Sequence, residues 1–214
     1  MANNNKNKGK TFERAFASHL STVFLLSFQR QPSSGAFTGG KNIVRVGKMS
    51  KEQELLHSGD IICPIELAHI EFECKFYKEF AWSSLFDSNA ILDKWIAQAS
   101  SSGKMWFLVF KINRTGEFVV YDTKYSGLCK PNGAGSFLYQ DRFLIQPMKG
   151  FFELNSDTLL LCRWDTHGTI RNDEAATSRM LDRQASLDQI SEHRQKDLDD
   201  LQILTQVHIV EVGD

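Results

Sequence analysis

Two carboxylates and one ammonium group lie close together along two predicted strands. Asp60 opens the apolar stretch 60–65, and the stretch 68–76 carries Glu73 and Lys75. Apolar and charged residues alternate in the second stretch, which is typical of a half-buried strand. Glu73 and Lys75 are two positions apart and therefore share one strand face. We expect the strands to pair antiparallel, which would bring both carboxylates within reach of one divalent cation.

These residue types suit chemistry on a phosphate. Mg²⁺ prefers oxygen ligands and usually takes one or two carboxylates together with waters and substrate phosphate. We expect the backbone carbonyl of Cys74 to be a further ligand and its thiol to lie in the core. The Lys75 ammonium can orient an attacking water or stabilise negative charge in the transition state. Glu13, on a preceding predicted helix, could complete the metal site or hold a second ion. Glu71 shares the face of Glu73 and is either an accessory carboxylate or solvated.

Charge is unevenly distributed along the 214 residues. The formal net charge is −1, yet residues 1–50 carry eight Lys and Arg side chains against one acidic residue. Residues 165–214 carry eleven acidic side chains against five basic ones. A basic segment of this kind binds polyanions without the whole chain being basic, or it is merely a solvated face.

The remaining sequence pattern predicts an α/β domain. Apolar residues at helical spacing predict a helix from Thr11, with Thr11 as its N-cap, and a second helix over 89–101. The apolar run 105–112 predicts a strand buried on both faces, paired with a strand over 117–122. Further short strands are expected at 142–147 and 158–163. Helices against a mixed sheet are the expected architecture.

Three segments are expected along the chain: a disordered basic arm over 1–9, a domain over 10–170 and an acidic helical extension over 171–214. The helix expected in the extension has a thin apolar stripe, which favours docking on the domain, on a second copy or on a protein partner. The four cysteines have neither zinc-site nor dense disulfide spacing, and no apolar run is long enough to span a membrane. We therefore expect a cytoplasmic protein.

The motifs in this order resemble the PD-(D/E)XK nuclease superfamily, and within it the archaeal-type Holliday junction resolvases and related phage endonucleases. The resemblance covers roughly residues 8–122. It is carried by four motifs: Lys10-x-x-Glu13-Arg14, Arg30-x-x-Ser33-Ser34-Gly35, Ser58-Gly59-Asp60-Ile61-Ile62 and Glu71-Phe72-Glu73-Cys74-Lys75. Gly59 stands where the motif's name has proline, at a position that varies widely in the superfamily.

The resemblance implies a restriction-endonuclease-like core and identifies site residues one by one. The family's helix glutamate corresponds to Glu13, its motif aspartate to Asp60, and its Glu-x-Lys pair to Glu73 and Lys75. The serine of its Ser-Gly loop corresponds to Ser34 or to Ser33, and a glutamine on the following helix corresponds to Gln98. The residues expected to bind the DNA backbone are Lys10, Arg14, Arg30, Ser33, Ser34, Lys41, Arg45 and Lys48.

The function that the resemblance implies is Mg²⁺-dependent hydrolysis of DNA phosphodiester bonds, with Mn²⁺ as an expected substitute. Resolution of a junction needs two symmetric cuts, so a resolvase would act as a homodimer. Two alternatives stay open. One is a phage or restriction-type nuclease acting on other DNA, and the other is a catalytically silent DNA-binding or scaffold protein of the same fold. A phage-encoded protein would work in the host cytoplasm.

Overall fold

The computed structural model describes residues 2–32, 59–133, 135–164 and 170–172. Its helices are α1 (Ala2–Phe24), α5 (Ala90–Ala99) and α6 (Phe151–Leu161), with short 3-10 turns η2 (Ile65–Leu67), η3 (Trp82–Phe86) and η4 (Thr123–Tyr125). Its strands are β1 (Gln29–Arg30), β2 (Ile61–Ile62), β3 (Ile70–Tyr77), β4 (Met105–Ile112), β5 (Gly116–Asp122), β6 (Phe137–Tyr139), β7 (Phe143–Pro147), β8 (Cys162–Trp164) and β9 (Ile170–Asn172).

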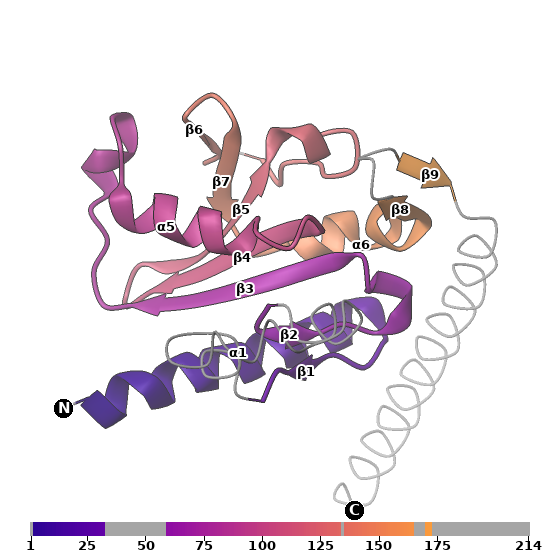
Figure 1. Ribbon diagram of the computed structural model, residues 1–214, viewed down its shortest axis with the longest axis horizontal. Coiled ribbons are helices and arrows are strands. Elements are labelled where there is room, and N and C mark those ends of the chain that lie inside the picture. Colours follow the sequence, from indigo (N-terminus) through magenta and orange to yellow (C-terminus); the bar gives the residue numbers. More distant parts are fainter. Residues whose placement is uncertain (1, 33–58, 134, 165–169, 173–214) are drawn as a thin grey trace, which may run out of the picture. The chain divides into compact units, whose positions relative to one another are not determined.

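Five of these strands form one mixed sheet in the order β3-β4-β5-β7-β6. β3 and β4 are parallel and joined through α5, whereas the other neighbours pair antiparallel. Figure 1 shows α1 running alongside β3, the outermost strand. The expected mixed sheet flanked by helices is therefore confirmed.

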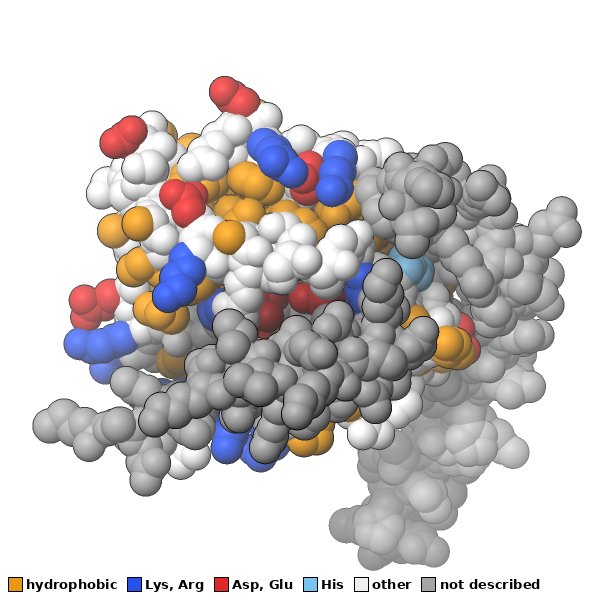
Figure 2. All heavy atoms as spheres, in the orientation of Figure 1, with side chains coloured by type: hydrophobic (Ala, Val, Ile, Leu, Met, Phe, Trp, Pro, Cys, Tyr) orange, Lys and Arg blue, Asp and Glu red, His pale blue; other side chains and the backbone are white. Residues whose placement is uncertain are grey.

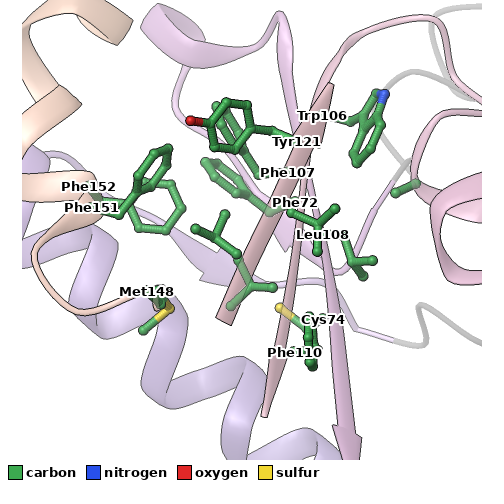
Figure 3. Close-up of a cluster of buried hydrophobic side chains, with 14 of the residues drawn as sticks. Phe72, Cys74, Trp106, Phe107, Leu108, Phe110, Tyr121, Met148, Phe151 and Phe152 are labelled. Atoms are coloured by element: carbon green, nitrogen blue, oxygen red, sulfur yellow. The ribbon is translucent and has the colours of Figure 1, made fainter. Parts of the chain in front are cut away.

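The two faces of the sheet are covered by different helices. Phe72 on β3 contacts Phe16 of α1 and Phe152 of α6, with ring centroids 5.6 and 5.8 Å apart. Phe110 on β4 lies on the opposite face and meets Trp95 of α5 at 5.7 Å. Figure 3 shows the densely aromatic packing around Phe72. Since Glu73 follows Phe72 directly, its side chain lies on the α5 face.

Two strand predictions and one helix prediction are confirmed closely. The run over 105–112 is β4, which is almost entirely buried, and it pairs antiparallel with β5. The helix expected over 89–101 is α5, whose N-cap Asn89 accepts hydrogen bonds from the backbone N–H groups of Ile91 and Leu92. Such a cap satisfies donors that the helix leaves unpaired.

Other expectations were wrong. Thr11 does not cap α1, because its hydroxyl donates to the carbonyl of Asn7 inside a helix that begins at Ala2. Most of the expected disordered arm over 1–9 is thus helical, since extending an existing helix adds a hydrogen bond for each residue fixed. The strand expected over 158–163 is largely the end of α6, followed by β8.

The C-terminal boundary differs from the one expected. β8 and β9 pair antiparallel, so the expected division between residues 170 and 171 falls inside β9. The acidic extension from Asp173 onward lies outside the described residues. No helix among the described residues is long and apolar enough to cross a membrane.

Candidate active site

Asp60 is fixed against the outer edge of β3 by hydrogen bonds to the backbone of that strand. Its N–H donates to the carbonyl of Phe72 at 2.8 Å, and its carboxylate Oδ2 accepts from the N–H of Cys74 at 2.9 Å. The antiparallel pair expected here is wrong in detail, because β2 pairs with β1 instead. Asp60 nevertheless lies beside β3 as the sequence suggested, with a side chain that is largely buried.

Gly59 allows this close approach. Its φ is +75°, and a Cβ atom placed there would lie 2.9 Å from the carbonyl oxygen of Phe72. A side chain at this position would have to displace the backbone of β3, and the positive φ is itself unfavourable for residues other than glycine. Glycine therefore has a specific structural role directly before Asp60.

Glu73, Lys75 and Gln98 form a connected group on the α5 face of β3. Gln98 on α5 donates from Nε2 to Glu73 Oε1 at 2.7 Å and accepts at Oε1 from Lys75 Nζ at 3.0 Å. Lys75 Nζ also donates to Glu73 Oε1. The sequence predicted all three residues, and the structure brings them together.

Two carboxylates of this site have raised pKa values. Burial, and after it the charge of the adjacent Asp60 carboxylate, raise the pKa of Glu73 to about 8 against the opposing effect of Lys75. The pKa of Glu13 is also raised, first by burial and then by Asp60. Clustered acids of this kind favour a bound cation or a proton.

Glu13 comes from α1, on the other side of the β3 edge. One of its carboxylate oxygens, Oε2, lies 3.5 Å from a guanidinium nitrogen of Arg30 on β1. The same oxygen is buried and accepts no hydrogen bond. Glu13, Asp60 and Glu73, together with Lys75 and Gln98, are called the carboxylate cluster below.

The backbone carbonyl of Cys74 faces the same edge as Asp60. The N–H and C=O of one strand residue point to the same side, and the Cys74 N–H already donates to Asp60. The Cys74 thiol lies among the core residues instead, and burial raises its pKa well above the usual value. The backbone carbonyl of Cys74, and not its sulfur, therefore lies at the edge where the sequence predicted a cation.

The donor set fits a hard divalent cation, although it is not a preassembled cage. Among the described residues, no three His, Cys, Asp or Glu side chains are grouped as a ready metal site. Asp60, Glu73 and the Cys74 carbonyl supply the two carboxylates and one neutral oxygen that Mg²⁺ accepts when water and phosphate complete its shell. The orphaned Glu13 oxygen adds an acceptor that no protein donor uses.

Only some of the predicted DNA-binding residues belong to the described chain. Arg14 is exposed on α1 and Lys10 is partly exposed one turn earlier, whereas Arg30 is mostly buried beside Glu13. Figure 2 shows acidic side chains near the middle of one face, with basic side chains on either side. The predicted residues outside the described part of the chain are Ser33, Ser34, Lys41, Arg45 and Lys48.

Two features escaped the sequence interpretation. Glu71 is 4% exposed, so the expectation of a solvated side chain is wrong. The alternation of charged and apolar residues placed it on one strand face but could not show that this face is covered. The contact of Arg30 with Glu13 was also missed, because an arginine close to a Ser-Ser-Gly loop carries no signal of burial.

Comparison with known proteins bears on this arrangement. The sequence profile of the family described as "Phage putative PDDEXK endonuclease" matches residues 4–142. Among solved structures, the chain is similar to Hjc of Archaeoglobus fulgidus, a Holliday junction resolvase, with 12% identity and a TM-score of 0.33 over 70% of this chain and 98% of that chain. A search of curated proteins gave no match. Because the family profile covers more than half of the chain, and includes Glu13, Asp60, Glu73 and Lys75, this protein belongs to the family of phage PDDEXK endonucleases.

Proposed function

We propose that this nuclease is a divalent-metal-dependent endodeoxyribonuclease that selects branched DNA, as a Holliday junction resolvase does. The observation that carries the proposal is the meeting of Asp60, Glu73 and Lys75 at the outer edge of β3. Two acidic side chains and one ammonium group, beside an outward-facing backbone carbonyl, can bind a divalent cation and support phosphodiester hydrolysis.

The residues of the carboxylate cluster have distinct proposed roles. Asp60, Glu73 and the Cys74 carbonyl would hold Mg²⁺, or Mn²⁺ in its place, and Glu13 would contribute to the same ion or to a second one. A bound cation of this kind lowers the pKa of a coordinated water and neutralises charge on the phosphate.

The protein's own groups orient the reaction. Gln98 hydrogen-bonds to both Glu73 and Lys75, so it would fix the carboxylate and the ammonium group relative to each other. Lys75 would then position the attacking water or stabilise the charge that develops on the phosphate oxygens. Gln98 is an accessory residue in this scheme, since it acts through Glu73 and Lys75.

Recognition would depend on the DNA backbone more than on base identity. The basic side chains of the N-terminal region, with Arg14 exposed on α1, suit phosphate contacts that fix position without reading sequence. Two symmetric cuts in a four-way junction imply a homodimer with two active sites. The acidic extension is proposed to dock on a protein partner, on a second copy or on the basic surface. The proposed location is the cytoplasm, which for a phage-encoded protein is the cytoplasm of the host.

A cleavage assay tests the proposal. Wild type and Glu73→Ala are incubated with labelled four-way junction, linear duplex or single-stranded DNA in Mg²⁺, Mn²⁺ or chelator. We expect paired cuts in the junction that need the cation and disappear in Glu73→Ala. Glu79→Ala is the matched control, because Glu79 is exposed and pairs only with its neighbour Lys78 among the described contacts.

The other outcomes separate the alternatives. Metal-dependent cleavage of duplex or single strands, with junctions left intact, would keep the chemistry and refute junction selectivity. Absence of cleavage on every substrate and with every cation would refute the enzymatic proposal, leaving a DNA-binding protein of nuclease fold.

A further inference from the structure

We infer that Arg30 is a positioning residue for Glu13 and not a contact to the DNA backbone. The inference rests on the proposed function, because it assigns Glu13 to the same cation site. It replaces the role that the sequence predicted for Arg30, which was phosphate binding.

The first argument is where the guanidinium lies. The Arg30 side chain is 17% exposed and the Glu13 side chain is 14% exposed, with 3.5 Å between their nearest polar atoms. The same guanidinium nitrogen donates to the backbone carbonyl of Gln31 at 2.7 Å. A phosphate contact needs an arginine that extends into solvent, as Arg14 does on α1.

The second argument is that the segment carrying Arg30 also fixes Asp60. Arg30 pairs with Ile61 in the β1–β2 ribbon, and the N–H of Gln31 donates to the carbonyl of Asp60 at 2.8 Å. The short segment 30–31 is therefore bound to one proposed ligand through its backbone and to another through a side chain. It sets the spacing between α1 and the edge of β3 at the carboxylate cluster.

The third argument is charge. Glu13 is mostly buried and lies near Asp60, so a negative charge there needs an opposite charge close by. Arg30 supplies that charge beside Glu13 Oε2. This oxygen accepts no hydrogen bond, so its lone pairs are available to a cation. The planar guanidinium can serve the carboxylate and the Gln31 carbonyl together, which a lysine ammonium does with less geometric control.

DNA affinity without cation provides the first test. Binding of a labelled junction to the full chain is measured by fluorescence anisotropy in chelator, over a range of salt concentrations. We expect Arg30→Gln to bind DNA within about twofold of wild type with an unchanged salt slope, whereas loss of a phosphate contact reduces that slope by about 1. Arg14→Gln is the matched comparison, with the same substitution at an exposed position. A reduced salt slope in Arg30→Gln would overturn the inference.

Cation binding provides the second test and does not depend on activity. Mn²⁺ is titrated into wild type, Arg30→Gln, Glu13→Gln and the double variant, and bound ion is followed by electron paramagnetic resonance. Changes to groups that orient metal ligands typically weaken binding by about 10–100-fold. We expect a loss in this range for each single variant and no further loss in the double variant, because both changes act on one unit.

Several results would contradict the inference. Mn²⁺ affinity that Arg30→Gln leaves unchanged overturns it, and so do losses that multiply in the double variant. Arg30→Lys keeps the charge and should show a smaller loss in the same direction, which gives a second measurement if Arg30→Gln does not fold. A wild type that cleaves no DNA would refute the proposed function, yet DNA and Mn²⁺ binding would still decide the role of Arg30.

Discussion

The buried Glu73 carboxylate makes the stability of the metal-free protein depend on pH. Burial, with Asp60 beside it, raises the pKa of Glu73 from 4.5 to about 8. Between these values the folded state holds a proton that the unfolded state releases, so the free energy of unfolding falls as pH rises through this window. The difference corresponds to roughly 5 kcal/mol when fully developed. The Glu73 side chain is only 4% exposed, so solvent screens little of this effect.

Urea unfolding in the presence of chelator measures this contribution. Wild type and Glu73→Gln are compared at intervals from about pH 4.5 to pH 8.5, and the difference between their unfolding free energies is plotted against pH. We expect wild type to lose stability relative to Glu73→Gln as pH rises. Titrating groups outside the carboxylate cluster contribute equally to both proteins and cancel in the difference.

Two controls sharpen the measurement. Glu79→Gln makes the same chemical change at a side chain that is 80% exposed, and its curve should follow wild type. Adding Mg²⁺ should restore stability mainly at the alkaline end, because a cation that binds ionised carboxylates stabilises the folded state. A difference curve between wild type and Glu73→Gln that is flat, or that rises with pH, would refute the account of Glu73.

Three further outcomes are expected. Gly59→Ala and Gly103→Ala impose the same backbone strain, at φ +75° and +76°, but of the two only Gly59 has backbone within 3 Å of the added Cβ. Only Gly59→Ala should therefore abolish cleavage and lower the free energy of unfolding by more than the ~1–2 kcal/mol that the conformation alone costs. Equal losses of stability and activity in the two variants would contradict this. Asn89→Ala removes the α5 cap and should lower the free energy of unfolding by about 1 kcal/mol in thermal or urea unfolding. Deleting residues 173–214 should raise DNA affinity or change the oligomeric state, as measured by anisotropy and light scattering; a deletion that changes neither would count against docking of the acidic extension.

The sequence predicted well those strands whose residues follow one simple pattern along their whole length. β4 is buried on both faces and its sequence is a continuous apolar run. β3 alternates although both of its faces are buried up to Cys74, because its charged residues Glu71 and Glu73 lie on one of those buried faces. α6 was missed because two of its buried positions are the polar residues Asn155 and Ser156, and because the apolar run 159–162, which continues from α6 into β8, resembles that of a buried strand. Periodicity alone does not separate these two cases.

The proposed site was predictable in its members but not in its geometry. The spacing of Asp60, Glu73 and Lys75 indicated carboxylates near one cation, and the structure places them beside one strand edge. What the spacing could not show is that Asp60 is attached to β3 by one hydrogen bond from its backbone and one to its side chain, or that Arg30 faces inward. Both depend on how β1 and β2 pair, which involves residues more than thirty positions apart.

The position of Asp60 beside the edge strand β3 also bears on the choice of an inactive variant for work with DNA. Its carboxylate accepts a hydrogen bond from the Cys74 N–H, which would otherwise be an unpaired donor on a sheet edge. Unpaired edges of this kind attract strands from other molecules. Asp60→Ala would therefore remove a ligand and expose an edge, and any loss of cleavage could reflect self-association. Asp60→Asn retains an acceptor for Cys74 while removing the negative charge, which makes it the better variant for trapping an uncut DNA complex.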